Sequence, residues 1–150
     1  MFLLKNVSVI FCLLCGLDNR FGWSRIRLAP GLWRLTAVAL LLYAGSYLLF
    51  IPVCNANRFA ASIIQVEAGQ TVADHGPYRF LRHPLDSISL LLWLSMPLAL
   101  GSFVALPAVA LTTPILVLRL LNEEKILRHE LSGYSEYCQR TPWRLIPFVW

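Results

Sequence analysis

The stretch "PLALGS", residues 97–102, separates two long apolar runs and contains no charged residue. The runs extend over Leu85–Leu100 and Ser102–Leu121. So short a connection between two runs of helical length predicts a tight helical hairpin, whose two ends return to the same side. We therefore expect the polar segments that flank the hairpin, residues 76–84 and 119–140, to lie side by side. Polar residues that meet at one face of a membrane are typical of a functional site.

Composition indicates a membrane protein. The chain has 150 residues, of which 57% are hydrophobic, and its mean hydropathy is +0.62. A soluble domain of this size does not bury so much apolar surface. Phe2–Leu17 and Leu32–Val53 are further apolar runs, so four segments approach the length that crosses a hydrocarbon core of about 30 Å. We predict one all-α integral membrane domain over residues 1–150, with N-terminal helices in 1–56 and a core in 57–150.

The predicted fold has about four transmembrane helices, with a C-terminal helical hairpin and a cytoplasmic C-terminal helix. Thirteen Lys and Arg residues outnumber eight Asp and Glu residues. If the 54–84 loop and the C-terminal segment are cytoplasmic, the basic residues follow the positive-inside rule, and no nucleic-acid partner is implied. Nine then lie inside, Lys5, Arg58, Arg79, Arg82, Arg119, Lys125, Arg128, Arg140 and Arg144, and four outside, Arg20, Arg25, Arg27 and Arg34. The first run could instead be a signal peptide, although no A-x-A-like cleavage site follows it.

Several kinds of site are not supported. Cys12 and Cys15 spell C-x-x-C inside an apolar run without a βαβ pattern, so they are interpreted as membrane-filling residues. No G-x-G occurs, which excludes a Rossmann fingerprint, and no G-x-S-x-G marks a hydrolase. The three histidines lack the spacing of metal ligands, so no metal site is expected.

"GPYRFLRHPLDSI", residues 76–88, precedes the third helix. Pro84 keeps His83 out of the α region and suits the first helical position, so His83 is predicted as the N-cap and Asp86 falls in the first turn. An acid there complements the positive end of the helix. Alternatively, the backbone N–H groups of that turn, together with the nearby arginines, could hold an anionic ligand. The arginines could also simply reach the membrane interface.

"RLLNEEKILRHELSGYSEYCQR", residues 119–140, follows the fourth apolar run. On a helix, Glu124 shares a face with three leucines, and a carboxylate in an apolar stripe is costly unless a cation meets it. Glu123 lies four residues after Arg119, and Glu124 lies four before Arg128. Ordinary ion pairs along the helix would explain either glutamate as well as a functional role would.

Four segments together resemble the isoprenylcysteine carboxyl methyltransferase family of membrane enzymes. They are "NRF" at 57–59, "GPYRFLRHP" at 76–84, "EEKILRHELSGYSEYCQR" at 123–140 and "WRLIP" at 143–147. "LDNRFGWS" at 17–24 is similar to a connection found upstream in bacterial members. The chain begins late relative to longer members, which leaves open whether N-terminal helices are missing.

The resemblance implies S-adenosylmethionine as cofactor, bound without a Rossmann fold by the last two helices and the C-terminal segment. It also implies a lipophilic small-molecule or lipidated substrate within membrane lipid. The implied cofactor residues are Gly76, Tyr78, Arg82, His83, Pro84, Glu123, Glu124, Tyr137 and Arg140. Arg82 and His83 would serve the cofactor's carboxylate, Glu124 or Glu123 its ammonium, and Tyr78 would border the adenine. Glu123, Glu124 and Asp86 are the candidate catalytic residues, as bases for an amine acceptor.

The sequence departs from the family pattern after Arg-His-Pro. Members usually have any residue and then an aromatic one, whereas here Leu85 is followed by Asp86. Asp86 could be a substrate-specific acid, a simple helix-start residue or the mark of a member without activity. Three functional alternatives therefore stay open: a phospholipid amine N-methyltransferase, a steroid-type membrane reductase that uses NADPH, and a non-catalytic membrane protein that keeps the ligand shell.

Overall fold

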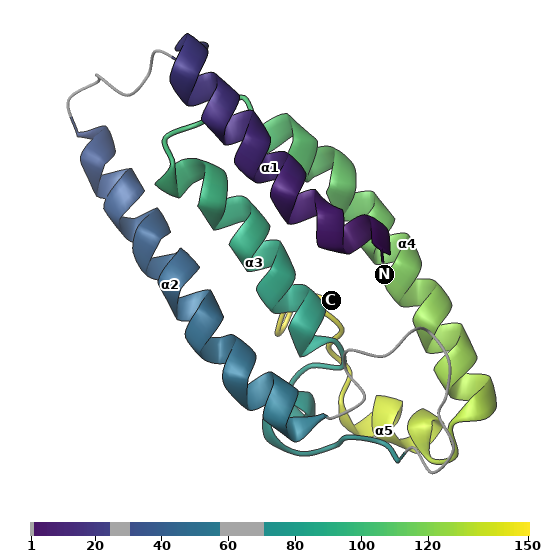
Figure 1. Ribbon diagram of the computed structural model, residues 1–150. Helices are drawn as coiled ribbons and strands as arrows, with labels where there is room; N and C mark the ends of the chain where they lie inside the picture. Colours follow the sequence, from purple (N-terminus) through teal and green to yellow (C-terminus); the bar gives the residue numbers. More distant parts are fainter. Residues whose placement is uncertain (1, 25–30, 58–70) are drawn as a thin grey trace. The chain divides into compact units, whose positions relative to one another are not determined.

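The described structure is entirely helical. The computed structural model describes residues 2–24, 31–57 and 71–150, and no strand occurs within these ranges. It has α-helices α1 (Phe2–Phe21), α2 (Leu32–Ala56), α3 (Pro84–Ala99), α4 (Leu106–Glu130) and α5 (Tyr134–Arg140), and the short 3-10 helix η2 (Gly76–Arg79) (Figure 1). The all-α prediction is confirmed. Arg25, Arg27, Arg58 and Phe59, on which some predictions rest, lie outside the described residues.

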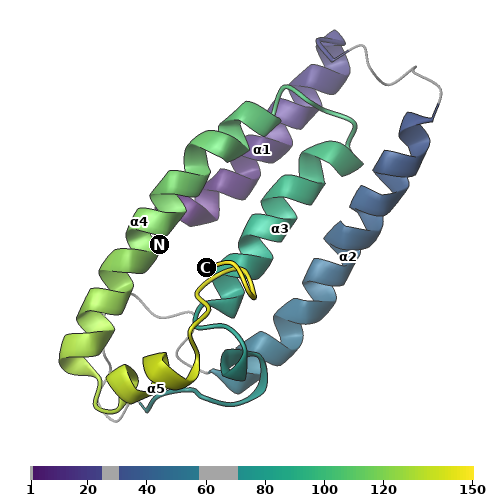
Figure 2. The same ribbon diagram turned by 180° about the vertical axis from the view of Figure 1, so that it is seen from behind.

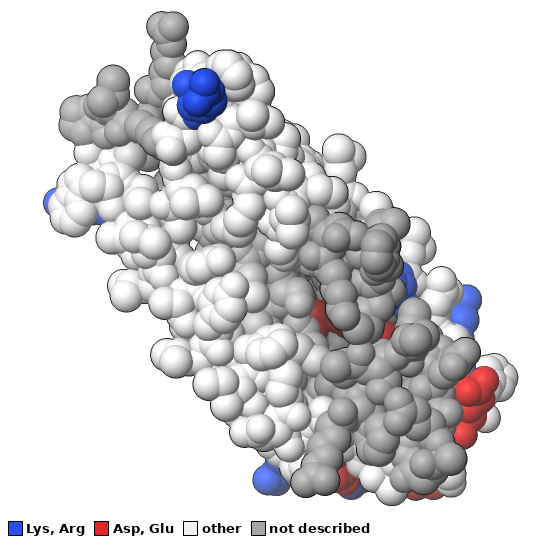
Figure 3. Space-filling model, viewed as in Figure 1, with Lys and Arg blue, Asp and Glu red and all other residues white. Residues whose placement is uncertain are grey.

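Two helices are long and apolar enough to cross a membrane. These are α2 and α4, whereas α3 is apolar but has only 16 residues. Four leucines on α2 and α4 expose at least 62% of their surface, as lipid-facing side chains would: Leu41, Leu48, Leu111 and Leu118. The surface over the middle of α2 shows almost no charged side chain (Figure 3). The described helices thus support a membrane protein, but the predicted number of four spans is not confirmed.

The chain divides into two compact units, and the first comprises Met1–Tyr47 and Ser89–Ile115. In it, α1 packs on α3. The ring of Phe11 meets that of Trp93 edge to face, with 6.0 Å between centroids, and the Trp93 indole N–H donates to the Ser8 hydroxyl at 3.1 Å. An aromatic pair of this geometry adds to the stabilisation from burial, and the indole donor is satisfied.

The turn between α3 and α4 is held by the residues that follow α1. The buried Asp18 carboxylate accepts a hydrogen bond from the Ser24 backbone N–H at 2.7 Å. The Ser24 hydroxyl oxygen in turn accepts from the backbone N–H groups of Phe103 and Val104, at 3.1 and 3.3 Å. Gly101 takes a positive φ of 66° in this turn, a conformation that glycine adopts without strain. Ser24 therefore supplies the acceptor for two turn amides that the helices leave unpaired.

The second unit comprises Leu48–Ile88 and Leu116–Trp150. Its part of α3 begins as predicted. Pro84 is the first helical residue, the carbonyl of His83 accepts from the Ser87 N–H at 3.1 Å, and Asp86 lies in the first turn. The sequence rule for proline at a helix start is confirmed.

The C-terminal segment of the second unit lies along the residues that precede α3 (Figure 2). The Arg82 N–H donates to the carbonyl of Trp143 at 2.9 Å, and the His83 N–H donates to that of Arg144 at 3.1 Å. The Ser87 hydroxyl donates to the Leu145 carbonyl at 2.6 Å. These bonds, with those of Arg82 described below, confirm that segments 76–84 and 119–140 meet. The predicted domain organisation, with its boundary after residue 56, stays a prediction.

Replacing Ser24 by alanine tests the turn between α3 and α4. Ser24→Ala leaves two backbone donors without their acceptor, and we expect a loss of about 1–3 kcal/mol in the free energy of unfolding. Ser46→Ala is the matched control, because the buried Ser46 hydroxyl only donates to the Leu42 carbonyl of its own helix. Thermal unfolding of the detergent-purified protein, followed by circular dichroism, measures both. Equal midpoints for the two variants would contradict the role assigned to Ser24.

Candidate functional site

A buried carboxylate lies at the centre of the second unit. Glu124 on α4 is only 3% exposed. Its Oε1 lies 3.0 Å from Nη1 of Arg82, and its Oε2 lies 3.2 Å from Nε of Arg144 and 3.8 Å from Nη2 of Arg128. The expectation that a cation must meet this carboxylate is therefore confirmed. Three guanidinium groups around one carboxylate leave an excess of positive charge.

All three nitrogen atoms of the Arg82 guanidinium group donate hydrogen bonds. Besides the pair with Glu124, its Nε donates to the Thr141 carbonyl at 2.6 Å and its Nη2 to the Cys138 carbonyl at 2.9 Å. The side chain is 8% exposed. Planar guanidinium donors suit such a fixed set of acceptors. Arg82 thereby ties the segment before α3 to α4 and to the end of α5.

His83 bridges two carboxylates and keeps one nitrogen unpaired. Its Nδ1 lies 3.8 Å from Oδ2 of Asp86, and its Nε2 lies 3.5 Å from Oε1 of Glu124, without hydrogen-bond geometry. The residue is 6% exposed, and among the described residues Nε2 has no hydrogen-bond partner. A buried polar atom without a partner indicates a position where a ligand or water completes the bonding.

Asp86 and Glu123 share one arginine. Nη1 of Arg119 donates to Oδ1 of Asp86 at 2.8 Å, and Nη2 donates to Oε2 of Glu123 at 3.1 Å. The expected pair between Arg119 and Glu123 along the helix is confirmed, whereas the contact with Asp86 was not predicted. Two carboxylates on one guanidinium leave one negative charge uncompensated. This cluster therefore differs in sign from the surroundings of Glu124.

Tyr78 and Tyr137 fix the loop that contains η2. The Tyr137 hydroxyl donates to the carbonyls of Tyr78 and Leu81, at 2.7 and 3.3 Å. Burial raises the pKa of Tyr78 to about 12 and also raises the pKa of Tyr137 above its usual value. Both hydroxyls therefore stay protonated near neutral pH and act as neutral hydrogen-bonding groups.

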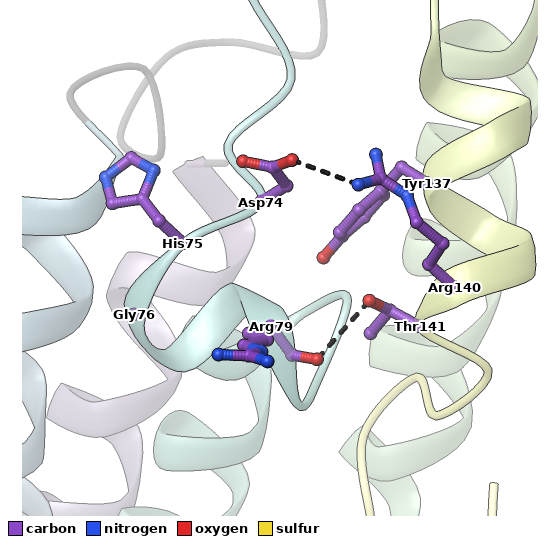
Figure 4. A pocket seen from close by; sticks show the side chains of 7 residues that line it. All are labelled: Asp74, His75, Gly76, Arg79, Tyr137, Arg140 and Thr141. Atoms are coloured by element: carbon purple, nitrogen blue, oxygen red, sulfur yellow. Dashed lines mark hydrogen bonds and ion pairs between the residues drawn. The ribbon is translucent and has the colours of Figure 1, made fainter.

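A pocket of about 580 Å³ lies beside this loop (Figure 4). Nη1 of Arg140 lies 3.5 Å from Oδ2 of Asp74 at its rim, and the Thr141 hydroxyl lies 3.4 Å from the Arg79 carbonyl. It is lined by Asp74, His75, Gly76, Arg79, Tyr137, Arg140 and Thr141.

The residues predicted for the site thus fall into separate groups. Arg82 and His83 surround Glu124, Asp86 and Glu123 share Arg119, and Gly76, Tyr137 and Arg140 line the pocket. Pro84 begins α3, and Tyr78 is buried in η2.

One comparison identifies the family. The model of the isoprenylcysteine carboxyl methyltransferase (ICMT) family matches residues 37–129, more than half of the chain. The chain belongs to the ICMT family. This membership confirms the resemblance inferred from sequence segments and indicates a membrane methyltransferase. No curated protein and no solved structure was found to match.

The ICMT match covers part of the candidate site. It includes the charged residues of both clusters from Arg82 to Arg128, but not Arg144. It ends before α5 and the C-terminal segment, so Tyr137, Arg140 and Arg144 lie beyond it. In the described ranges, no group of three or more His, Cys, Asp or Glu residues is arranged to hold a metal ion.

Sequence reasoning missed three contacts, that of Arg119 with Asp86 and those of Arg82 and Arg144 with Glu124. A signal existed for the first, because Arg119 is the single charged residue of the apolar run Ser102–Leu121. A cation so placed needs a carboxylate on a neighbouring helix, and Asp86 stands at the other end of the predicted hairpin. For Arg144 we find no comparable signal, because its position depends on the course of the C-terminal segment.

The neighbouring glutamates provide a matched test of the buried network. Glu124→Gln leaves Arg82 and Arg144 without their buried counter-charge, and we expect a loss of about 3–5 kcal/mol in the free energy of unfolding. Glu123→Gln removes a more exposed pair and should cost no more than about 1 kcal/mol. Denaturant titration in detergent compares the two. A stability loss at Glu123 as large as that at Glu124 would contradict the assignment of the structural charge to Glu124.

Proposed function

We propose that this ICMT-family chain is an integral membrane methyltransferase that uses S-adenosylmethionine. The acceptor is the carboxylate of a prenylcysteine-like or other lipophilic substrate. The observation that supports the proposal is the buried Nε2 of His83, which lies between two clusters of opposite charge and has no hydrogen-bond partner among the described residues. His83 and the charged residues of both clusters except Arg144 lie within the family match. When bound, S-adenosylmethionine supplies an electrophilic methyl group on a sulfonium.

The two clusters complement the amino-acid end of this cofactor, which carries a carboxylate and an ammonium. His83 would donate from Nε2 to the carboxylate, in the positive field of Arg82 and Arg144. Glu123 would meet the ammonium. Both oxygens of Glu124 already face arginines, whereas the Glu123 side chain is 26% exposed and pairs with Arg119 alone among the described ion pairs. Glu124 then acts as the residue that positions Arg82 and His83.

Methylation of a carboxylate requires little acid–base catalysis by the protein. The acceptor is already anionic, so the residues of the site need only bind, orient and exclude water. The buried Arg82, His83 and Glu124 form a fixed wall for this purpose, since their own charges are largely satisfied by one another. The buried ring of Tyr78 would border the adenine, with Gly76 and Pro84 shaping the backbone around it.

The proposal includes a membrane arrangement. Four helices cross the bilayer, α3 and α4 form the hairpin, and the 54–84 loop and the C-terminal segment face the cytoplasm. The charged clusters would then lie at the cytoplasmic end of the spans, where a water-soluble cofactor is available. The lipophilic acceptor would reach them from the bilayer.

One observation favours a second function, N-methylation of a phospholipid amine. Asp86 and Glu123 share the single cation Arg119, and an uncompensated carboxylate there could attract an amine headgroup and take its proton. The reductase alternative requires NADPH, and the non-catalytic alternative requires ligand binding without turnover. Cofactor preference separates the two methyltransferases from the reductase, and turnover separates these three from the non-catalytic protein. The acceptor that is methylated separates the two methyltransferases.

His83 provides the test of cofactor binding. We expect the detergent-purified protein to bind S-adenosylhomocysteine saturably and NADPH not at all, measured by isothermal titration calorimetry. His83→Gln should weaken binding at least about tenfold, because a hydrogen bond to a charged group is lost. The matched control is His129→Gln, since His129 is an exposed residue near the end of α4. Equal affinities of the two variants, or a preference for NADPH, would contradict the proposal.

Asp86 distinguishes the two acceptors. With phosphatidylethanolamine as acceptor, Asp86→Asn removes a general base and should lower turnover about 10²–10⁴-fold. With an S-prenylated cysteine carboxylate, which needs no base, the same variant should keep its turnover within a few-fold. Transfer of a radiolabelled methyl group to each acceptor measures both. Full activity of Asp86→Asn on the amine would exclude Asp86 as its base, and transfer to neither acceptor would favour the non-catalytic alternative.

A further inference from the structure

The pocket beside η2 has a chemistry of its own. Among the described residues, its lining includes two arginines and a histidine but a single carboxylate, and it includes neither Glu124 nor the arginines that pair with Glu124. We propose that this pocket binds a phosphate group, either that of a phospholipid headgroup or that of a free phosphate compound. The inference is separate from the methyltransferase proposal and does not depend on it.

The arginines of the pocket are available to an anion. Arg140 pairs with Asp74 at 3.5 Å, but the two side chains are 66% and 48% exposed, so water competes with this contact and it is weak. The Arg79 guanidinium has no ion pair or hydrogen bond to any described residue. Guanidinium groups bind phosphate with two parallel hydrogen bonds, so either exposed, weakly committed arginine of the lining is a suitable contact for a phosphate group.

The pocket lies next to the end of a candidate membrane span. Gly76 lines it with a positive φ of 58°, and a Cβ at this position would lie 3.3 Å from the Cβ of Ala56, the last residue of α2. Phe80, directly after Arg79, is 68% exposed, as is common for aromatic residues at a membrane interface. Phospholipid phosphates occupy the same level of a bilayer, and basic side chains there attract anionic headgroups.

Charge argues against S-adenosylmethionine as the occupant. Arg79 and Arg140 against Asp74 give the described lining a formal charge of +1. The cofactor carries an ammonium and a sulfonium against one carboxylate, so its net charge has the same sign. The Tyr137 hydroxyl, which could have recognised a neutral ligand, donates instead to the carbonyls of Tyr78 and Leu81. An anion is therefore the better complement to this pocket.

The test titrates the full chain in detergent with phosphatidylglycerol, with diacylglycerol of the same acyl chains, and with inorganic phosphate. Native mass spectrometry counts bound lipid, and the shift of the unfolding midpoint gives the affinity. We expect saturable binding of phosphatidylglycerol and none of diacylglycerol. Competition of inorganic phosphate with phosphatidylglycerol would show that a free phosphate compound is sufficient for binding. Binding of phosphatidylglycerol without such competition would show that the site requires the lipid headgroup. Either result supports a phosphate site.

Four variants test whether phosphatidylglycerol binds in this pocket. Arg79→Gln and Arg140→Gln should each weaken it at least about tenfold, since each removes charge-assisted hydrogen bonds. Arg79→Lys, which keeps the charge, should retain part of it. Asp74→Asn should strengthen binding several-fold, because it frees Arg140, and a purely structural role of Asp74 would not produce this gain.

The control is Lys125→Gln, which removes an equal charge from an exposed α4 residue outside the pocket. Equal binding by the control and by both glutamine variants would overturn the proposal. So would the absence of saturable binding to the folded wild-type protein, or an Arg79→Gln variant that loses S-adenosylhomocysteine and keeps phosphatidylglycerol. Failure of the wild type to bind S-adenosylhomocysteine would contradict the methyltransferase proposal alone.

Discussion

The second unit depends on the burial of one carboxylate. An isolated charge inside a protein is costly, and Glu124 is 3% exposed, so the structure must bring cations to it. Arg82 arrives from the segment before α3 and Arg144 from the C-terminal segment. Because Arg82 also donates to the carbonyls of Cys138 and Thr141, the end of α5 is fixed by the same residue. One buried carboxylate and its two arginines thus join four stretches of chain.

Local sequence patterns predicted much of this arrangement, but they did not predict the contacts between residues that lie far apart in the sequence. Apolar runs and the uncharged connection "PLALGS" indicated the helices and the meeting of the polar segments. Proline chemistry placed the start of α3 at Pro84, and helical periodicity showed that Glu124 needed a cation. Arg144 could not be predicted, because no periodicity relates an irregular C-terminal segment to a helix. Nor could the number of spans be confirmed, since only α2 and α4 among the described helices are long and apolar enough to cross a membrane.

Three polar regions among the described residues of the second unit differ in charge. They are the surroundings of Glu124, the cluster on Arg119 and the pocket beside η2. The surroundings of Glu124 are positive, and their charged groups pair with one another, which gives rigidity; Nε2 of His83 lies 3.5 Å from Oε1 of Glu124 without hydrogen-bond geometry. The cluster on Arg119 is negative and more exposed, which suits a cationic group. The pocket beside η2 is positive and exposed, which suits an anion. Segregation of sign within a small unit gives a cationic and an anionic group each a site of complementary charge.

Asp86 departs from the family pattern, and its contacts in the structure restrict the roles that it can have. A helix-start role explains its place in the first turn of α3, but it does not explain the 2.8 Å contact with Arg119 on another helix. Without that contact, the only charged side chain of an apolar run would pair with Glu123 alone among the described ion pairs, and its second Nη donor would lose its acceptor. Asp86 is therefore integral to the charge balance of the site. The contact with Arg119 therefore gives Asp86 a role between the two helices that it would have whether or not it also acts on a substrate.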